Sequence, residues 1–218
     1  MSPPELRPAM AADAADIAAL VLVSAEKFLP AVFGPRIETV MRGLAAGKDT
    51  LFSHRHCTIA TAEGRVVAML LGYTGKEKAA EDPATGWGLL RGLGLGMIGR
   101  LGRLLRLQAT IGTLGRDEYY VSNVAAYPGF QGQGTGTLLL DRAEKRAFEA
   151  GAEAIVLDVE TDNLSAIRFY QRRGYVVRHR TAPLGAEGHQ FSFLRLGKPP
   201  RGAEAAPGRY DSRSTPSS

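Results

Sequence analysis

The stretch FQGQGTGTLLLD, residues 130–141, places three glycines at alternate positions directly before an apolar run. Glycine inside a helix costs about 1 kcal/mol relative to alanine, yet residues 137–150 have the composition of a good helix. Glycines at a helix entrance let backbone N–H groups approach an anion, and the helix N-terminus adds unpaired donors and the positive end of its dipole. We therefore interpret the stretch as a phosphate-binding loop that opens a helix.

Two familiar phosphate loops do not fit these residues. The dinucleotide-binding pattern Gly-x-Gly-x-x-Gly fails because Thr137 or Leu139 stands where its third glycine belongs. The P-loop pattern fails because no Gly-Lys-Ser/Thr follows. What remains is Gln131-x-x-Gly134-x-Gly136, placed between a strand-like segment and a helix.

The segments around this loop alternate between strand and helix patterns. We expect helices over residues 12–28, 36–47, 137–150 and 163–173. We expect strands over residues 5–7, 118–127, 154–160, 175–181 and 189–196, and a hairpin over 56–75 with a turn at Glu63-Gly64. This order predicts an α/β fold with a mixed sheet.

The length and composition are those of one globular domain. The chain has 218 residues, of which 44% are hydrophobic. We expect the domain to cover residues 1–196, and residues 197–218, rich in Pro, Gly, Ser and Arg, to form a disordered tail.

The sequence also indicates the cellular compartment and the kinds of binding partner to expect. No apolar run approaches the roughly 20 residues of a membrane span, and the N-terminus lacks the pattern of a signal peptide. The single Cys57 excludes an internal disulfide, which fits a cytoplasmic location. The net charge of +5 allows anionic partners but does not indicate nucleic acid.

The loop and its flanks resemble the GCN5-related N-acetyltransferase (GNAT) family. That family carries the acyl-CoA-binding motif Gln/Arg-x-x-Gly-x-Gly/Ala between its fourth strand and third helix. Here NVAAYPGFQGQGTG (residues 123–136) resembles the family's strand, proline and loop. LDVETDNLSAIRFYQRRGY (residues 157–175) resembles its next strand and helix, and is closest in pattern to ribosomal-protein-type N-terminal acetyltransferases. The likeness is strong over residues 118–180 and weak over 5–75.

The resemblance implies a GNAT fold: a mixed central β-sheet flanked by helices, in which the fourth and fifth strands (residues 119–126 and 154–160) splay apart. It also implies direct transfer of an acetyl group from acetyl-CoA, as cosubstrate, to a peptide, protein or small-molecule amine, without a metal. A non-catalytic acyl-CoA sensor and a membrane-surface binding protein are the alternatives. The protein would be a monomer or a homodimer.

The same resemblance implies a coenzyme-binding set. The backbone of residues 132–137 would hold the pyrophosphate, and the backbones of two strand residues would bond the pantetheine arm. Asn163 would contact the coenzyme or only cap its helix. The whole set is Val124, Ala126, Gln131, Gly132, Gln133, Gly134, Thr135, Gly136, Thr137 and Asn163.

Three residues are candidates for catalysis. Tyr170 matches the family tyrosine that protonates the departing thiolate, although its helical spacing also fits a core residue. Asp158 matches a catalytic glutamate of the N-terminal acetyltransferases, and Glu118 lies where other members place a base. The need for a base depends on the acceptor, because deprotonation at pH 7 costs about 4.6 kcal/mol for a lysine and about 1.4 kcal/mol for an α-amine.

Residues 76–117 form an insertion where most family members have a short turn. Its middle, residues 87–107, has four arginines, six glycines and no acid. On a helical wheel most arginines lie on one side, while the glycines weaken a helix before Met97. The opposite side gathers Leu93, Met97, Leu101, Leu104 and Leu105. A lid over the acceptor site, a dimer contact, a membrane-surface helix and a helix packed on the domain are the alternatives.

The stretch HRHC, residues 54–57, raises the question of a metal site. His54 and His56 would share a face of a strand, but no second cysteine exists and no spacing matches a zinc site. We expect a plain strand edge.

Overall fold

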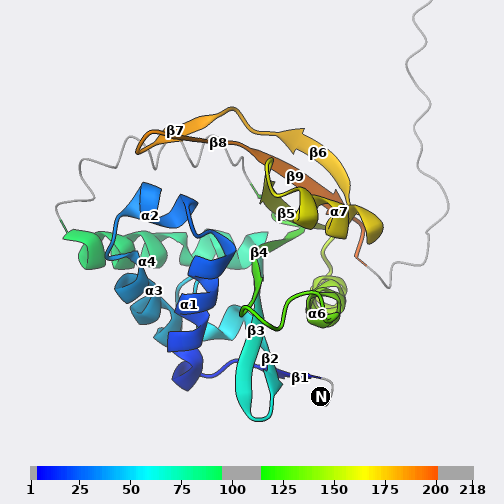
Figure 1. Ribbon diagram of the computed structural model, residues 1–218, viewed down its shortest axis with the longest axis horizontal. Coiled ribbons are helices and arrows are strands. Elements are labelled where there is room, and N and C mark those ends of the chain that lie inside the picture. The colour runs from blue at the N-terminus through cyan, green and yellow to red at the C-terminus, as the bar shows by residue number, and fades with distance from the viewer. Residues whose placement is uncertain (1–3, 95–113, 201–218) are drawn as a thin grey trace, which may run out of the picture.

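A seven-stranded mixed sheet forms the centre of the molecule in a computed structural model that describes residues 4–94 and 114–200 (Figure 1). The strand order is β1-β2-β3-β4-β5-β9-β6, and β7 and β8 form a separate two-stranded ribbon. The strands are β1 (Glu5–Pro8), β2 (Cys57–Ala62), β3 (Arg65–Thr74), β4 (Glu118–Ala126), β5 (Ala154–Glu160), β6 (Val176–Arg180), β7 (Leu184–Ala186), β8 (His189–Phe191) and β9 (Phe193–Lys198).

Helices cover both faces of the sheet, and each face has its own apolar core. On one face lie α1 (Ala14–Ser24), α2 (Phe28–Phe33), α3 (Ile37–Ala46) and α4 (Gly75–Leu93), and on the other lie α6 (Thr135–Glu149) and α7 (Leu164–Arg172) (Figure 1). No helix within the described ranges is long and apolar enough to cross a bilayer. The predicted α/β fold with helices on a mixed sheet is confirmed.

Two turn residues specify the β2–β3 hairpin. Glu63 and Gly64, the two residues between the strands, have φ angles of +51° and +74°. This left-handed pair matches the right-handed twist of the flanking strands and favours glycine. The predicted hairpin and its turn are confirmed.

The splay between β4 and β5 creates the opening in the sheet. The parallel pairing begins at Glu118 with Ala154 and ends at Val121 with Leu157. Directly after Val121, the register between β3 and β4 skips Ser122. This β-bulge bends β4. Beyond it β4 stays paired with β3 and β5 with β9, so the two strands separate.

The first part of the insertion is a helix, although its glycines predicted a weak one. A capping box between Thr74 and Glu77 starts α4. Built on Gly88 and Gly92, a Cβ would lie 2.6 Å from Leu44 and from Val40 of α3. These glycines let two helices approach closely, and that packing offsets their low helix propensity. The amphipathic segment around Met97 lies outside the described residues.

Two smaller expectations were wrong. His54–His56 is a 3-10 helix rather than a strand, and the imidazole Nε2 of His56 lies 2.7 Å from a carboxylate oxygen of Glu81 in α4. The final strand β9 runs on through Lys198, two residues into the expected tail. The Lys198 ammonium pairs with the buried Glu144 of α6 at 2.8 Å, which fixes this end of the strand.

Candidate active site

A cavity of about 880 Å³ lies where β4 and β5 separate, and it reaches both faces of the sheet. Leu157, Val159 and Tyr170 line it from the core of the α6 face. Phe28 and Tyr73 line it from the core of the α1 face. A ligand entering from the α6 side could therefore meet a second ligand from the α1 side inside the sheet.

The glycine loop is shaped for an anion at the start of α6. Gly132 and Gly134 have φ angles of +74° and +83°, and Gly134 is the residue that caps the helix. A Cβ built on either would have no protein atom within 4 Å, so the space beside both glycines is open. The first backbone N–H groups of α6 lack acceptors within their own helix and are available to a phosphate.

The open edge of β4 presents backbone groups toward the gap. Tyr127 donates its N–H to the Val67 carbonyl of β3, so the groups of Ala126 and Val124, which alternate with it, point away from β3. The Gln131 side chain accordingly reaches the Ala126 carbonyl at 3.2 Å. An extended pantetheine arm would find strand-like donors and acceptors on this edge.

Tyr170 lies on α7, where its ring packs against aromatic neighbours and the residue lines the cavity. Its ring meets Phe169 and Tyr175 edge-on, with centroids 5.2 and 5.7 Å away. Burial raises the pKa of its phenol to about 12, so it is protonated at neutral pH. No residue of the described chain hydrogen-bonds to this hydroxyl. A phenol in this position could donate its proton to a ligand.

Asn163 caps α7 and also lines the cavity. Its side-chain oxygen accepts from the Ala166 N–H at 3.1 Å and from the Ser165 hydroxyl at 3.0 Å. The cap occupies the oxygen, while the amide NH₂ group could still serve a ligand.

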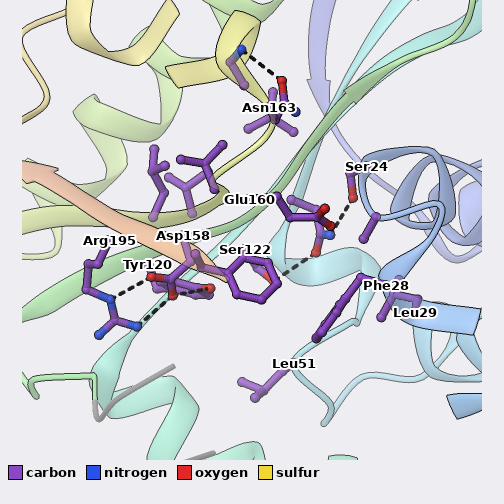
Figure 2. A pocket seen from close by; sticks show the side chains of 18 of the residues that line it. Ser24, Phe28, Leu29, Leu51, Tyr120, Ser122, Asp158, Glu160, Asn163 and Arg195 are labelled. Atoms are coloured by element: carbon purple, nitrogen blue, oxygen red, sulfur yellow. Dashed lines mark hydrogen bonds and ion pairs between the residues drawn. The ribbon is translucent and has the colours of Figure 1, made fainter. Parts of the chain in front are cut away.

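Asp158 lies in the cavity on the α1 side, but its carboxylate is already engaged. Arg195 of β9 donates to both oxygens, at 3.0 and 2.8 Å, and Tyr120 of β4 donates at 3.0 Å (Figure 2). Arg195 and Tyr120 therefore already occupy both oxygens of this carboxylate. This geometry does not favour the expected role of Asp158 as a base.

Glu118 lies at the closed end of the β4–β5 pair and does not line the cavity. Its carboxylate accepts from the Gly115 N–H at 2.9 Å and from Arg178 at 3.2 Å. It therefore closes the turn before β4, at the end of the strand away from the splay.

Glu160 is a cavity residue that the sequence did not single out. It lies two residues after Asp158 on the same face of β5, and Figure 2 shows it on the Ser24 side of the opening, apart from the Asp158–Arg195 pair. Burial, with the neighbouring charge of Asp162, raises the pKa of its carboxyl, and Lys27 partly opposes the shift. The alternation of β5 was the signal that could have identified it.

Comparison with known proteins agrees with this geometry. Residues 36–175 match the family model described as the acetyltransferase (GNAT) family. The chain belongs to the GNAT family. Acetyl-CoA is the acyl donor of this family. The matched region includes the glycine loop that joins β4 to α6.

Two curated relatives come from Bacillus subtilis (strain 168). The uncharacterized N-acetyltransferase YdgE is 35% identical over 60 residues, which are 28% of this chain and 38% of YdgE. The uncharacterized protein YdhI is 44% identical over 45 residues, which are 21% of this chain and 28% of YdhI. The chain therefore spans well under half the length of the curated relatives it matches.

Solved structures share the fold along nearly the whole chain. An N-acetyltransferase from Staphylococcus aureus Mu50 has a TM-score of 0.64 at 17% identity, covering 89% of this chain and 100% of that one. A ribosomal-protein-alanine N-acetyltransferase from Brucella melitensis has a TM-score of 0.57 at 16% identity, covering 89% and 99%. At these identities the likeness concerns the fold.

Proposed function

We propose that the protein is an acetyl-CoA-dependent N-acetyltransferase that transfers the acetyl group directly to an amine. The observation that carries this proposal is the cavity through the splay, which joins the open edge of β4 and Tyr170 on one face to a separate compartment on the other. Two substrates entering from opposite faces would meet there without a covalent enzyme intermediate. A cytoplasmic site of action remains a prediction from the single cysteine.

The residues suggest a division of roles in the reaction. The glycine loop would hold the pyrophosphate, while the edge of β4 would align the pantetheine arm and its thioester. The neutral amine nitrogen forms a bond to the thioester carbon, and the carbon–sulfur bond then breaks. The Tyr170 hydroxyl gives its proton to the departing thiolate and regains one, through solvent, from the nitrogen that has become an amide. We assign no base role to Glu118, which lies outside the cavity, or to Asp158, whose carboxylate is held by Arg195.

Steady-state release of coenzyme A tests this function. Purified protein is given acetyl-CoA and a panel of amines that includes peptides with free N-termini, polyamines and small primary amines. Amine-dependent release of coenzyme A together with an acetylated product would support the proposal. Binding of acetyl-CoA by calorimetry without turnover of any amine would instead support the non-catalytic sensor.

A further inference from the structure

Glu160 is a half-buried carboxylate of the cavity, on the α1 side of the sheet. Among the residues of the two described ranges, none hydrogen-bonds or ion-pairs with its side chain, although the side chain is half-buried in the cavity. A half-buried carboxylate without a protein partner is costly to hold. A cationic ligand group at this place would supply the missing partner.

Some of the other charges around the compartment are paired with each other, and the charges that remain make it acidic. Asp158 is paired with Arg195, and Lys78 of α4 is paired with Asp82. Among the residues that the structure describes, the other charged lining residues are Glu160, Glu26, Lys27 and Asp162, three carboxylates against one ammonium. The compartment therefore favours a positively charged acceptor, which an amine is at neutral pH.

Apolar residues form a large part of the rest of the cavity wall. Phe28 is held by edge-on contacts to Phe191 and Phe193, with ring centroids 5.3 and 5.1 Å away. Figure 2 shows Phe28, Leu29 and Leu51 on the same side of the cavity. The cavity-lining residues that belong to the α1-face core or pack against it include Phe28, Leu29, Phe33, Leu51, Phe52 and Leu114. Such a wall would bind an apolar group and would discriminate against a charged or strongly hydrated one.

We propose that the acceptor is a primary amine carried on an apolar arm, and that Glu160 binds its ammonium group and takes one proton from it. The arm lies against the phenylalanine and leucine wall while the nitrogen faces the splay. The proton moves from the ammonium to the Glu160 carboxylate, which leaves the neutral nitrogen that attacks the thioester. This inference rests on the proposed function and names its substrate class.

A matched series of amines tests the substrate class. 2-Phenylethylamine and n-hexylamine carry apolar arms, while 2-(2-aminoethoxy)ethanol and 6-aminohexanoate have similar lengths with polar or anionic arms. We expect kcat/KM for the apolar pair to exceed that of the polar pair by at least tenfold. Equal or reversed values, or turnover of peptides alone, would overturn the substrate class while the acetyltransferase function stands.

Two variants test Glu160 itself. Glu160→Gln should lower kcat/KM for 2-phenylethylamine by at least tenfold and should change the acidic limb of the pH–rate profile. Its affinity for coenzyme A should stay within twofold, because the carboxylate lies on the acceptor side. Glu153→Gln is the control, since Glu153 is an exposed residue just before the other end of β5 and lines no part of the cavity.

The outcomes separate the two proposals. A Glu160→Gln enzyme with unchanged kcat/KM and an unchanged pH profile would overturn the assignment of Glu160. Loss of coenzyme A binding in that variant would also overturn it, because the effect would then be a general distortion. If the unmodified protein neither binds acetyl-CoA nor acetylates any amine, the proposed function fails and this inference fails with it.

Discussion

The hydroxyl of Tyr170 gives the sharpest test at the scale of single residues. Tyr170→Phe keeps the ring and its contacts with Phe169 and Tyr175. No described group loses a hydrogen bond, so the melting temperature should change little, whereas the chemical step should slow by about 10²-fold. Coenzyme A affinity should change less than the rate, because the proton is needed only as the thiolate forms.

Single-turnover kinetics and a thermal melt on one preparation separate this role from core packing. A Tyr170→Phe enzyme that transfers acetyl groups at the full rate would leave water as the proton source. A variant that melts earlier while keeping its rate per folded molecule would make Tyr170 a structural residue.

At the scale of residues, the two carboxylates on β5 also differ in their hydrogen-bond partners. Asp158 and Glu160 lie on the same face, yet Arg195 and Tyr120 engage the first and no described side chain engages the second. In the sequence, the two residues are indistinguishable as acidic residues of one strand. Only the position of β9 beside β5 determines which of them is held by an arginine.

At the scale of elements, the left-handed backbone of Gly134 in the loop before α6 gives a testable prediction. Gly134→Ala places a Cβ in the open space beside the loop and costs about 1–2 kcal/mol of backbone strain. We expect coenzyme A affinity to fall by more than tenfold, because the backbone can no longer approach the pyrophosphate closely. Isothermal calorimetry with coenzyme A measures the change.

Gly64→Ala is the matched control for that loop. Gly64 has a similar φ of +74° and equally open surroundings, but it lies in the β2–β3 turn. Its substitution should cost comparable stability and leave coenzyme A affinity unchanged. Equal affinity losses in both variants would mean that strain, rather than the anion site, is being measured.

The contact between α3 and α4 gives a second prediction at this scale. Gly92→Ala would put a Cβ 2.6 Å from a γ-methyl group of Val40, whose branched side chain has little freedom to move. Overpacking of this kind costs about 1–3 kcal/mol and outweighs the gain in helix propensity. The melting temperature should therefore fall by several degrees.

Gly86→Ala, in the same helix, should have the opposite effect. A Cβ there would have no neighbour within 4 Å. The substitution therefore brings no overpacking and only a gain in helix propensity of up to about 1 kcal/mol. We expect the melting temperature to rise by about 2–4 °C. A destabilised Gly86→Ala protein would show that α4 does not pack as described.

At the scale of the whole molecule, an ion pair joins the edge of the sheet to the first helix. Arg7 of β1 donates to both oxygens of the buried Asp13 at 2.8 Å, and the Met10 N–H donates at 2.7 Å. The bond from Arg7 lowers the pKa of the Asp13 carboxyl in the folded state, in spite of its burial. This pair fixes the N-terminal strand against the start of α1.

The lowered pKa predicts a pH dependence of stability. A carboxyl whose folded pKa is depressed contributes stability that is fully present above its unfolded pKa of about 3.9 and is lost as pH falls through the folded value. Asp13→Asn should therefore lower the free energy of unfolding by about 1–3 kcal/mol at pH 7. The difference from the unmodified protein should shrink below about pH 4.

Urea denaturation at a series of pH values checks this dependence. Asp49→Asn is the control, because the Asp49 carboxylate is 87% exposed and lies 3.9 Å from Arg55. It should leave stability unchanged at every pH. A constant deficit of the Asp13→Asn protein from pH 7 down to pH 3 would contradict the ion-pair explanation.

The sequence alone determined the features that depend on neighbouring residues. The Glu63-Gly64 turn, the glycine entrance to α6 and the buried pattern of β5 were predicted and are present. Turn chemistry, helix capping and hydrophobic periodicity act over a few residues, so a local pattern is enough to specify them.

The tertiary structure alone decided the features that join distant segments. The glycines of α4 lower its helix propensity but allow close packing against α3, and Arg195 and Arg178 engage the carboxylates of Asp158 and Glu118. In each case the deciding partner lies dozens of residues away along the chain. Helix packing and ion pairing depend on distance in space, and only the folded sheet sets that distance.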